Sequence, residues 1–129
     1  MVDKNLTDAF VQSWIVMTDF FNDLVTNYSG WDQVRPMLKL IELFEENQLN
    51  KEFRAGQSLH SLCISRSAKH GLEMDYPSIA FCSLGNDKFE MIFFDGKTHH
   101  PKRQLVLSEI DIENDVYIAQ LLSVPIHGK

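Results

Sequence analysis

The sequence predicts an α+β fold, with N-terminal helices packed on one face of an antiparallel β-sheet of about four strands and a short C-terminal helix. Apolar residues recur every three or four positions in residues 1–50, which is the period of an amphipathic helix. In residues 57–112 apolar and polar residues alternate between turn signals, which is typical of strands. We expect a single domain over residues 1–129, with the short helix at 114–123, because a chain of this length supports one core better than two.

The first predicted helix covers LTDAFVQSWIVMTDFFNDLV. Its apolar face consists of Leu6, Phe10, Trp14, Met17, Phe21, Leu24 and Val25. Thr7 or Asn5 would cap its start, because either side chain can accept a hydrogen bond from a free amide of the first turn. Gly30 would end it, since glycine tolerates the left-handed backbone conformation.

The second predicted helix covers PMLKLIELFEEN. Pro36 suits its first position, where an amide would have no acceptor within the helix. Its inward-facing residues are expected to be Leu38, Ile41 and either Leu43 or Phe44.

The sheet is predicted from alternating segments that follow. SLHSLCISRS, SIAFCSL and KFEMIFF read as strands, with a further segment in THHPKRQLVL, whereas AKHGLEMDYP reads as a loop. Gly85-Asn86-Asp87 and Asp95-Gly96 are tight-turn signals. These connections are too short for helical crossovers, so the strands should run antiparallel.

The segment SEIDIENDVY carries an acidic residue at every second position. Its alternation favours a strand through Ile112, with Ile110 and Ile112 facing the core and the acids facing outward. A basic protein partner would relieve the mutual repulsion of such a row, whereas a solvated edge strand would use the same charges to prevent sheet association. The pattern favours neither interpretation over the other. The predicted contact residues are Glu109, Asp111, Glu113, Asp115, Asp87, Glu90 and Asp95.

The composition narrows the classes of partner. A formal net charge of −6 disfavours direct nucleic-acid binding and favours a basic protein. The N-terminus lacks the pattern of a signal peptide, and no stretch approaches the ~20 apolar residues of a membrane span. We therefore expect a cytoplasmic protein in which Cys63 and Cys82 stay reduced and act as small apolar residues.

Catalytic and metal-binding motifs are absent from the sequence. HExxH, CxxC, GxGxxG, P-loop and GxSxG patterns do not occur, and adjacent His99 and His100 would point to opposite sides of an extended segment. We expect no metal, no cofactor and no enzymatic activity. The one weak alternative is a small hydrolase in which His60 acts as base for Ser58 or Ser61.

Residues 53–60, FRAGQSLH, are followed by His70-Gly71-Leu72, a hairpin and FFDG at 93–96. Over about residues 50–96 this pattern resembles small immunity proteins of bacterial contact-dependent growth inhibition systems. The resemblance implies a cytoplasmic protein without an active site that binds and neutralises the toxic C-terminal domain delivered by a neighbouring cell. The toxin would be a basic protein, with a nuclease as the expected class, which an acidic inhibitor recognises by charge complementarity. The alternative function is a non-catalytic adaptor or structural domain that forms a homodimer through an exposed sheet edge.

Overall fold

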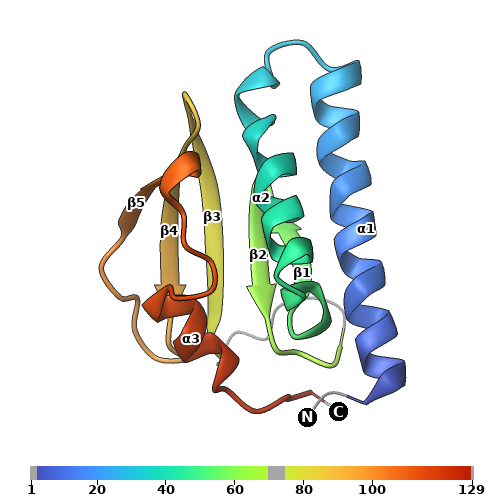
Figure 1. Ribbon diagram of the computed structural model, residues 1–129, viewed down its shortest axis with the longest axis vertical. Helices are drawn as coiled ribbons and strands as arrows, with labels where there is room; N and C mark the ends of the chain where they lie inside the picture. Colours follow the sequence, from blue (N-terminus) through green and yellow to red (C-terminus); the bar gives the residue numbers. More distant parts are fainter. Residues whose placement is uncertain (1–2, 70–74, 129) are drawn as a thin grey trace.

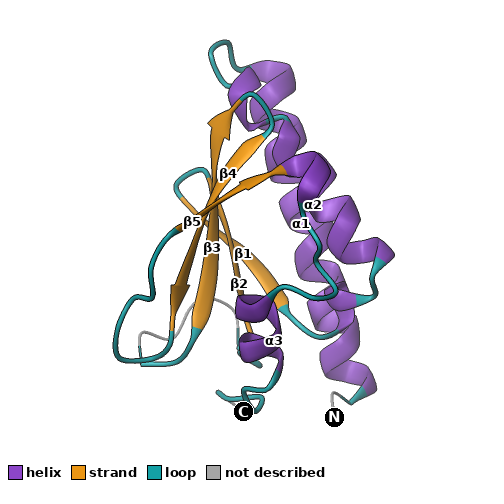
Figure 2. Ribbon diagram, turned by 60° about the vertical axis from the view of Figure 1, so that its left-hand side comes forward, coloured by secondary structure: helices purple, strands orange, loops and turns teal. Residues whose placement is uncertain are grey.

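The computed structural model describes residues 3–69 and 75–128, and its layers confirm the predicted α+β class (Figure 1). A five-stranded antiparallel sheet has the order β1-β2-β3-β4-β5, one strand more than expected. The helices lie on one side of this sheet, with α1 beside β1 (Figure 2). The elements are α1 (Lys4–Asn27), η1 (Asp32–Val34), α2 (Pro36–Glu46), η2 (Leu49–Lys51), β1 (Arg54–Ser58), β2 (Ser61–Ser65), β3 (Ser78–Gly85), β4 (Lys88–Phe94), β5 (Arg103–Val106), η3 (Leu107–Glu109) and α3 (Val116–Leu122).

Helix α1 follows the predicted period but starts earlier. Asp3 caps it, because its Oδ1 accepts from the amide of Leu6 at 2.9 Å, so the prediction of Thr7 or Asn5 was wrong. After the helix ends, Gly30 has the expected positive φ, +89°. The buried residues of the helix are Leu6, Phe10, Trp14, Met17 and Phe21, while Leu24 and Val25 are half-buried.

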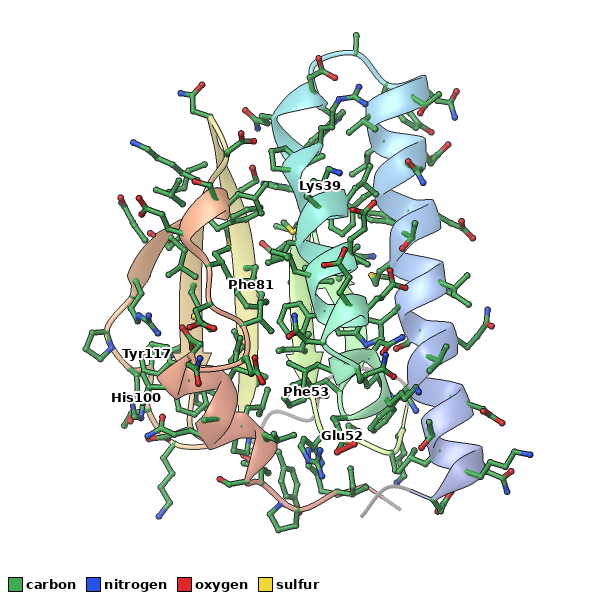
Figure 3. All side chains as sticks on the ribbon, viewed as in Figure 1. Lys39, Glu52, Phe53, Phe81, His100 and Tyr117 are labelled. Carbon is green, nitrogen blue, oxygen red and sulfur yellow. The ribbon has the colours of Figure 1, made fainter. Side chains whose placement is uncertain are left out.

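Helix α2 begins at Pro36 as predicted, but its buried face is rotated relative to the expectation. Met37, Leu40, Ile41 and Phe44 are buried, whereas Leu38 and Leu43 are only half-buried. The rotation follows from packing, since the Phe44 ring lies between Trp14 of α1 and Phe81 of β3, with ring centroids 5.0 and 5.8 Å away. Figure 3 shows Phe53 and Phe81 in this interior, and Lys39 on α2.

The first hairpin was not predicted. What was expected as one strand in SLHSLCISRS is instead the end of β1, a turn at Leu59-His60, and β2, with Ser58 paired to Ser61. Leu59 has φ +56°, a conformation that costs a leucine about 1–2 kcal/mol. The turn therefore contains no glycine or asparagine from which a hairpin could be predicted.

The second hairpin formed as predicted, with positive φ at Gly85, Asn86 and Asp87. Gly96 in the next turn also has positive φ, and a Cβ there would lie 3.1 Å from the Asp75 carbonyl oxygen. Part of the predicted loop over 68–77, residues 70–74, lies outside the described residues.

The predicted strand through Ile112 is absent from residues 75–128. The chain forms η3 and then a turn, and α3 starts at Val116 rather than at residue 114. Local carboxylate hydrogen bonds decide this: Asp111 accepts from Asn114, and Asp115 accepts from the amides of Tyr117 and Ile118. Ile112 is nevertheless buried and Ile110 half-buried, as expected.

Helix α1 protects the outer edge of β1. Trp14 Nε1 donates to the Phe53 carbonyl at 2.9 Å, and Ser13 Oγ accepts from the Ala55 amide at 2.9 Å. These bonds satisfy edge groups that would otherwise lie unpaired near the core.

We expect Ser13→Ala to lower the free energy of unfolding by about 1–3 kcal/mol, because the Ala55 amide would lose its acceptor at a buried position. Thr18→Ala is the matched control, since its hydroxyl donates only to the Trp14 carbonyl of the same helix. It should cost less than about 0.5 kcal/mol. Urea denaturation measures both, and equal losses would contradict this role for α1.

Candidate functional site

The predicted acidic residues do not form one continuous row. Glu109, Asp111 and Glu113 are exposed on the segment between β5 and α3. Asp87 lies close to this segment, because its carbonyl accepts from the amide of Leu107 at 2.7 Å. These four residues make up the acidic segment that the structure brings together.

Asp115 is not an open contact residue. Its side chain is only 7% exposed and forms an ion pair with Arg103 at 2.7 Å, while its other oxygen caps α3. The guanidinium of Arg103 also lies 5.1 Å from the centre of the Tyr117 ring. The expectation of an outward carboxylate at position 115 is therefore corrected: it joins β5 to α3.

Glu90 and Asp95 lie away from the acidic segment. Glu90 alternates with the buried Phe89 and Met91, so it points to the sheet face opposite the helices, where Lys102 Nζ lies 3.7 Å from its carboxylate. Asp95 follows the far end of β4 from Asp87.

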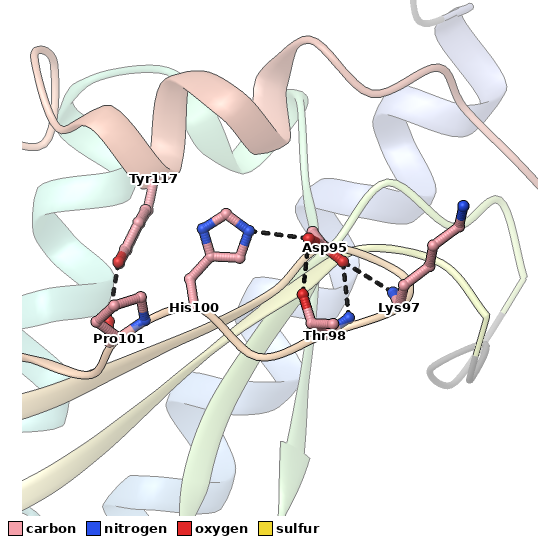
Figure 4. Close-up of polar contacts among 6 residues, drawn as sticks. All are labelled: Asp95, Lys97, Thr98, His100, Pro101 and Tyr117. Carbon is pink, nitrogen blue, oxygen red and sulfur yellow. Dashed lines mark hydrogen bonds and ion pairs between the residues drawn. The ribbon is translucent and has the colours of Figure 1, made fainter.

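Asp95 organises its own turn, as Figure 4 shows. Its Oδ1 accepts from the amides of Lys97 and Thr98, both at 2.8 Å, and its Oδ2 accepts from Thr98 Oγ1 at 3.1 Å and lies 2.9 Å from His100 Nε2. The Thr98 and Lys97 amides, followed by His100, hold the pKa of this carboxyl well below its usual range. Both carboxylate oxygens of Asp95 thus already have hydrogen-bond partners within the chain.

The acidic segment borders a hollow of about 300 Å³, which we call the acidic hollow. Glu109 and Asp111 lie at it, and within the described residues neither carboxylate has a cationic partner. Leu105, Ile110 and the exposed Val116 line it with apolar surface. Asn114 and the ion-paired Arg103 and Asp115 line the rest. The hollow therefore combines an apolar wall with two carboxylates that no described cation neutralises, although Asp111 also accepts hydrogen bonds from Asn114. Sequence reasoning missed Arg103 and Val116, because their roles depend on the fold and no local motif marks them.

The histidine–serine alternative finds no support in the geometry. His60 lies in the β1–β2 turn with its ring 5.2 Å from that of Trp31, and among the described residues no hydrogen bond joins it to Ser58 or Ser61. Ser61 Oγ lies instead 3.0 Å from Cys82 Sγ. Trp31 is half-buried against the core and against His60.

Burial raises the pKa of the Cys63 thiol to about 11, with nearby Cys82 adding to the shift. Such a thiol is neutral and unreactive at physiological pH. Over residues 3–69 and 75–128 no group of three or more His, Cys, Asp and Glu side chains is placed to hold a metal ion. No helix among the described residues is long and apolar enough to cross a bilayer.

Comparison with protein-family models, with curated proteins and with solved structures finds no match to this chain. Within the pattern that resembles immunity proteins, His70-Gly71-Leu72 lies outside the described residues. The immunity interpretation therefore stays a prediction from the sequence.

We expect Asp95→Asn to lower the urea midpoint at pH 7, because the folded state stabilises the ionised carboxylate. A depressed folded-state pKa contributes stability above the unfolded pKa of about 3.9 and loses it as pH falls below that value. The difference in urea midpoint between wild type and variant should accordingly shrink as the pH is lowered from 5 to the lowest pH at which the protein stays folded. A gap that is constant with pH would show that the carboxylate charge contributes nothing.

Proposed function

We propose that this protein is a cytoplasmic immunity protein that binds and neutralises a cognate contact-dependent inhibition toxin domain, with a nuclease as the expected class. The observation that carries the proposal is the acidic hollow, where Glu109 and Asp111 have no cationic partner among the described residues of a chain with net charge −6. The function requires no catalytic residue, cofactor or metal of the chain's own.

The acidic hollow suits a lysine or arginine side chain from a basic partner. The apolar stem of such a side chain would pack on Val116, Ile110 and Leu105, and its charged end would meet Glu109 and Asp111. Exposed Glu113, together with Asp87 beside η3, would add to the negative potential that attracts a basic surface. Nucleic acid would be repelled by the same field.

The segment that carries these acids is held in place before binding. Ile112 is 2% exposed, and Asp111 and Asp115 form local hydrogen bonds at either side of it. Binding would therefore order this surface at little cost in conformational entropy, which favours a high affinity for a given buried area.

We expect the double variant Glu109→Lys/Asp111→Lys to weaken binding to the cognate toxin domain by about tenfold or more, mainly through charge repulsion at the acidic hollow. The affinity of the wild-type protein should also fall as the ionic strength rises from about 0.01 to 0.15 M. The affinity of the variant should depend much less on ionic strength. Titration calorimetry measures both effects.

The matched control is Asp19→Lys/Glu46→Lys, which makes the same change in net charge at exposed positions on α1 and α2. It should retain most of the affinity. If both double variants lose affinity equally, net charge alone decides binding; if neither does and both are folded, the acidic hollow is not the contact site.

A second function, a non-catalytic homodimeric adaptor, is favoured by one observation. Strand β5 is an edge of the described sheet, with β4 as its neighbour, whereas α1 protects the β1 edge. An open edge can pair with a second copy. Light scattering of the purified chain distinguishes the two: a dimer at micromolar concentration supports the adaptor, and a monomer removes it.

A further inference from the structure

A groove of about 590 Å³ lies between α1 and the part of the sheet formed by β1 and β2. On the α1 side it is bordered by Val16 and Phe20. On the sheet side it is bordered by Gly56 and Cys63, which are paired across the two strands and alternate with the core residues Ala55 and Ile64. The volume is in the range of sites that bind small molecules.

Gly56 leaves the floor of this groove open. Its φ is not positive, so the backbone does not require glycine there, and a Cβ at this position would meet no atom within 4 Å. Glycine in the interior of a strand weakens it and often marks close approach of a ligand. The residue thus keeps space free at a cost in strand stability.

Arg54 brings a positive charge to the same groove. Its Nε and Nη2 donate to the carbonyls of Ser67 and Ala68 at 3.0 and 2.9 Å, and its guanidinium lies 5.4 Å from the centre of the Phe10 ring. No described carboxylate forms an ion pair with it, and its Nη1 donates to no described residue. Burial lowers its pKa, which reflects a charge partly removed from water.

The groove carries its positive charge toward one end, and its exposed apolar side chains lie toward the other. Arg54 lies beside Phe10, in the first half of α1, and Ser13 contacts Ala55. Helix α1 and strand β1 run in the same direction (Figure 1). Val16 and Phe20 follow Ser13 along α1, and Gly56 and Gln57 follow Arg54 along β1, so these four residues line the other end. A ligand that matches this arrangement has an anionic head and an apolar body.

We propose that this groove binds a small free carboxylate with an apolar chain. The carboxylate accepts hydrogen bonds from Nη1 of Arg54 and from the second N–H of Nη2, because Nε and the other N–H of Nη2 already donate to the Ser67 and Ala68 carbonyls. The chain lies over Gly56 and along Val16 and Phe20. This site is at the β1 edge of the sheet, whereas the acidic hollow is at the β5 edge, so the inference does not depend on the proposed function.

The first test uses sodium decanoate as probe, below the concentration at which it forms micelles, with decanol and decyltrimethylammonium as matched probes of different head groups. Titration monitored by nuclear magnetic resonance should show decanoate binding about tenfold tighter or more than either control. Equal binding of all three probes, or no binding of decanoate at about millimolar concentration, would overturn the proposal.

The second test uses variants of the groove. Gly56→Val should keep or raise the urea midpoint, because a β-branched residue favours a strand and meets open space, yet it should lose decanoate binding about tenfold or more. Val16→Asp should lose binding similarly, while Ile15→Asp should not, since Ile15 is equally exposed (44% against 49%) but does not line the groove. Unchanged binding by Gly56→Val, or equal losses in both aspartate variants, would contradict the assignment.

Discussion

The ion pair between Arg103 and Asp115 is the interaction on which the candidate binding surface depends. It joins β5 to α3 with a 2.7 Å contact, and the second oxygen of Asp115 caps the helix. Breaking such a pair from one side leaves a largely buried charge without a partner, which is strongly destabilising. Since Glu109, Asp111 and Glu113 lie in the connection between these two elements, their position follows from this pair and from the burial of Ile112.

The two edge strands of the sheet, β1 and β5, differ in the side chains that lie beside them. At β1, side chains of α1 satisfy the edge groups of Phe53 and Ala55, which obstructs pairing with a further strand. A groove remains between α1 and this part of the sheet. At β5 the neighbouring connection carries exposed carboxylates, which discourage nonspecific pairing and attract cations. The same charges therefore serve solubility and, in our proposal, recognition.

Regular periods in the sequence predicted α1, α2 and the β3–β4 hairpin, because a helical stripe or a glycine turn is a local signal. The β1–β2 hairpin was missed because Leu59 adopts a positive φ without a turn residue. The acidic row was misread as a strand because alternation is equally compatible with a turn, and the hydrogen bonds of Asp111 and Asp115 decide between them. Neither the Arg103 pairing nor the groove at Gly56 could be predicted, since both depend on contacts between distant segments.

Amide chemical-shift mapping with a candidate basic toxin domain tests our proposal that a preformed acidic surface docks on a basic partner. Our account predicts that the largest perturbations fall on residues 107–116 and on the adjacent turn at Asp87, with little change elsewhere. Perturbations confined to α1 and the open face of the sheet, with residues 107–116 unaffected, would contradict it.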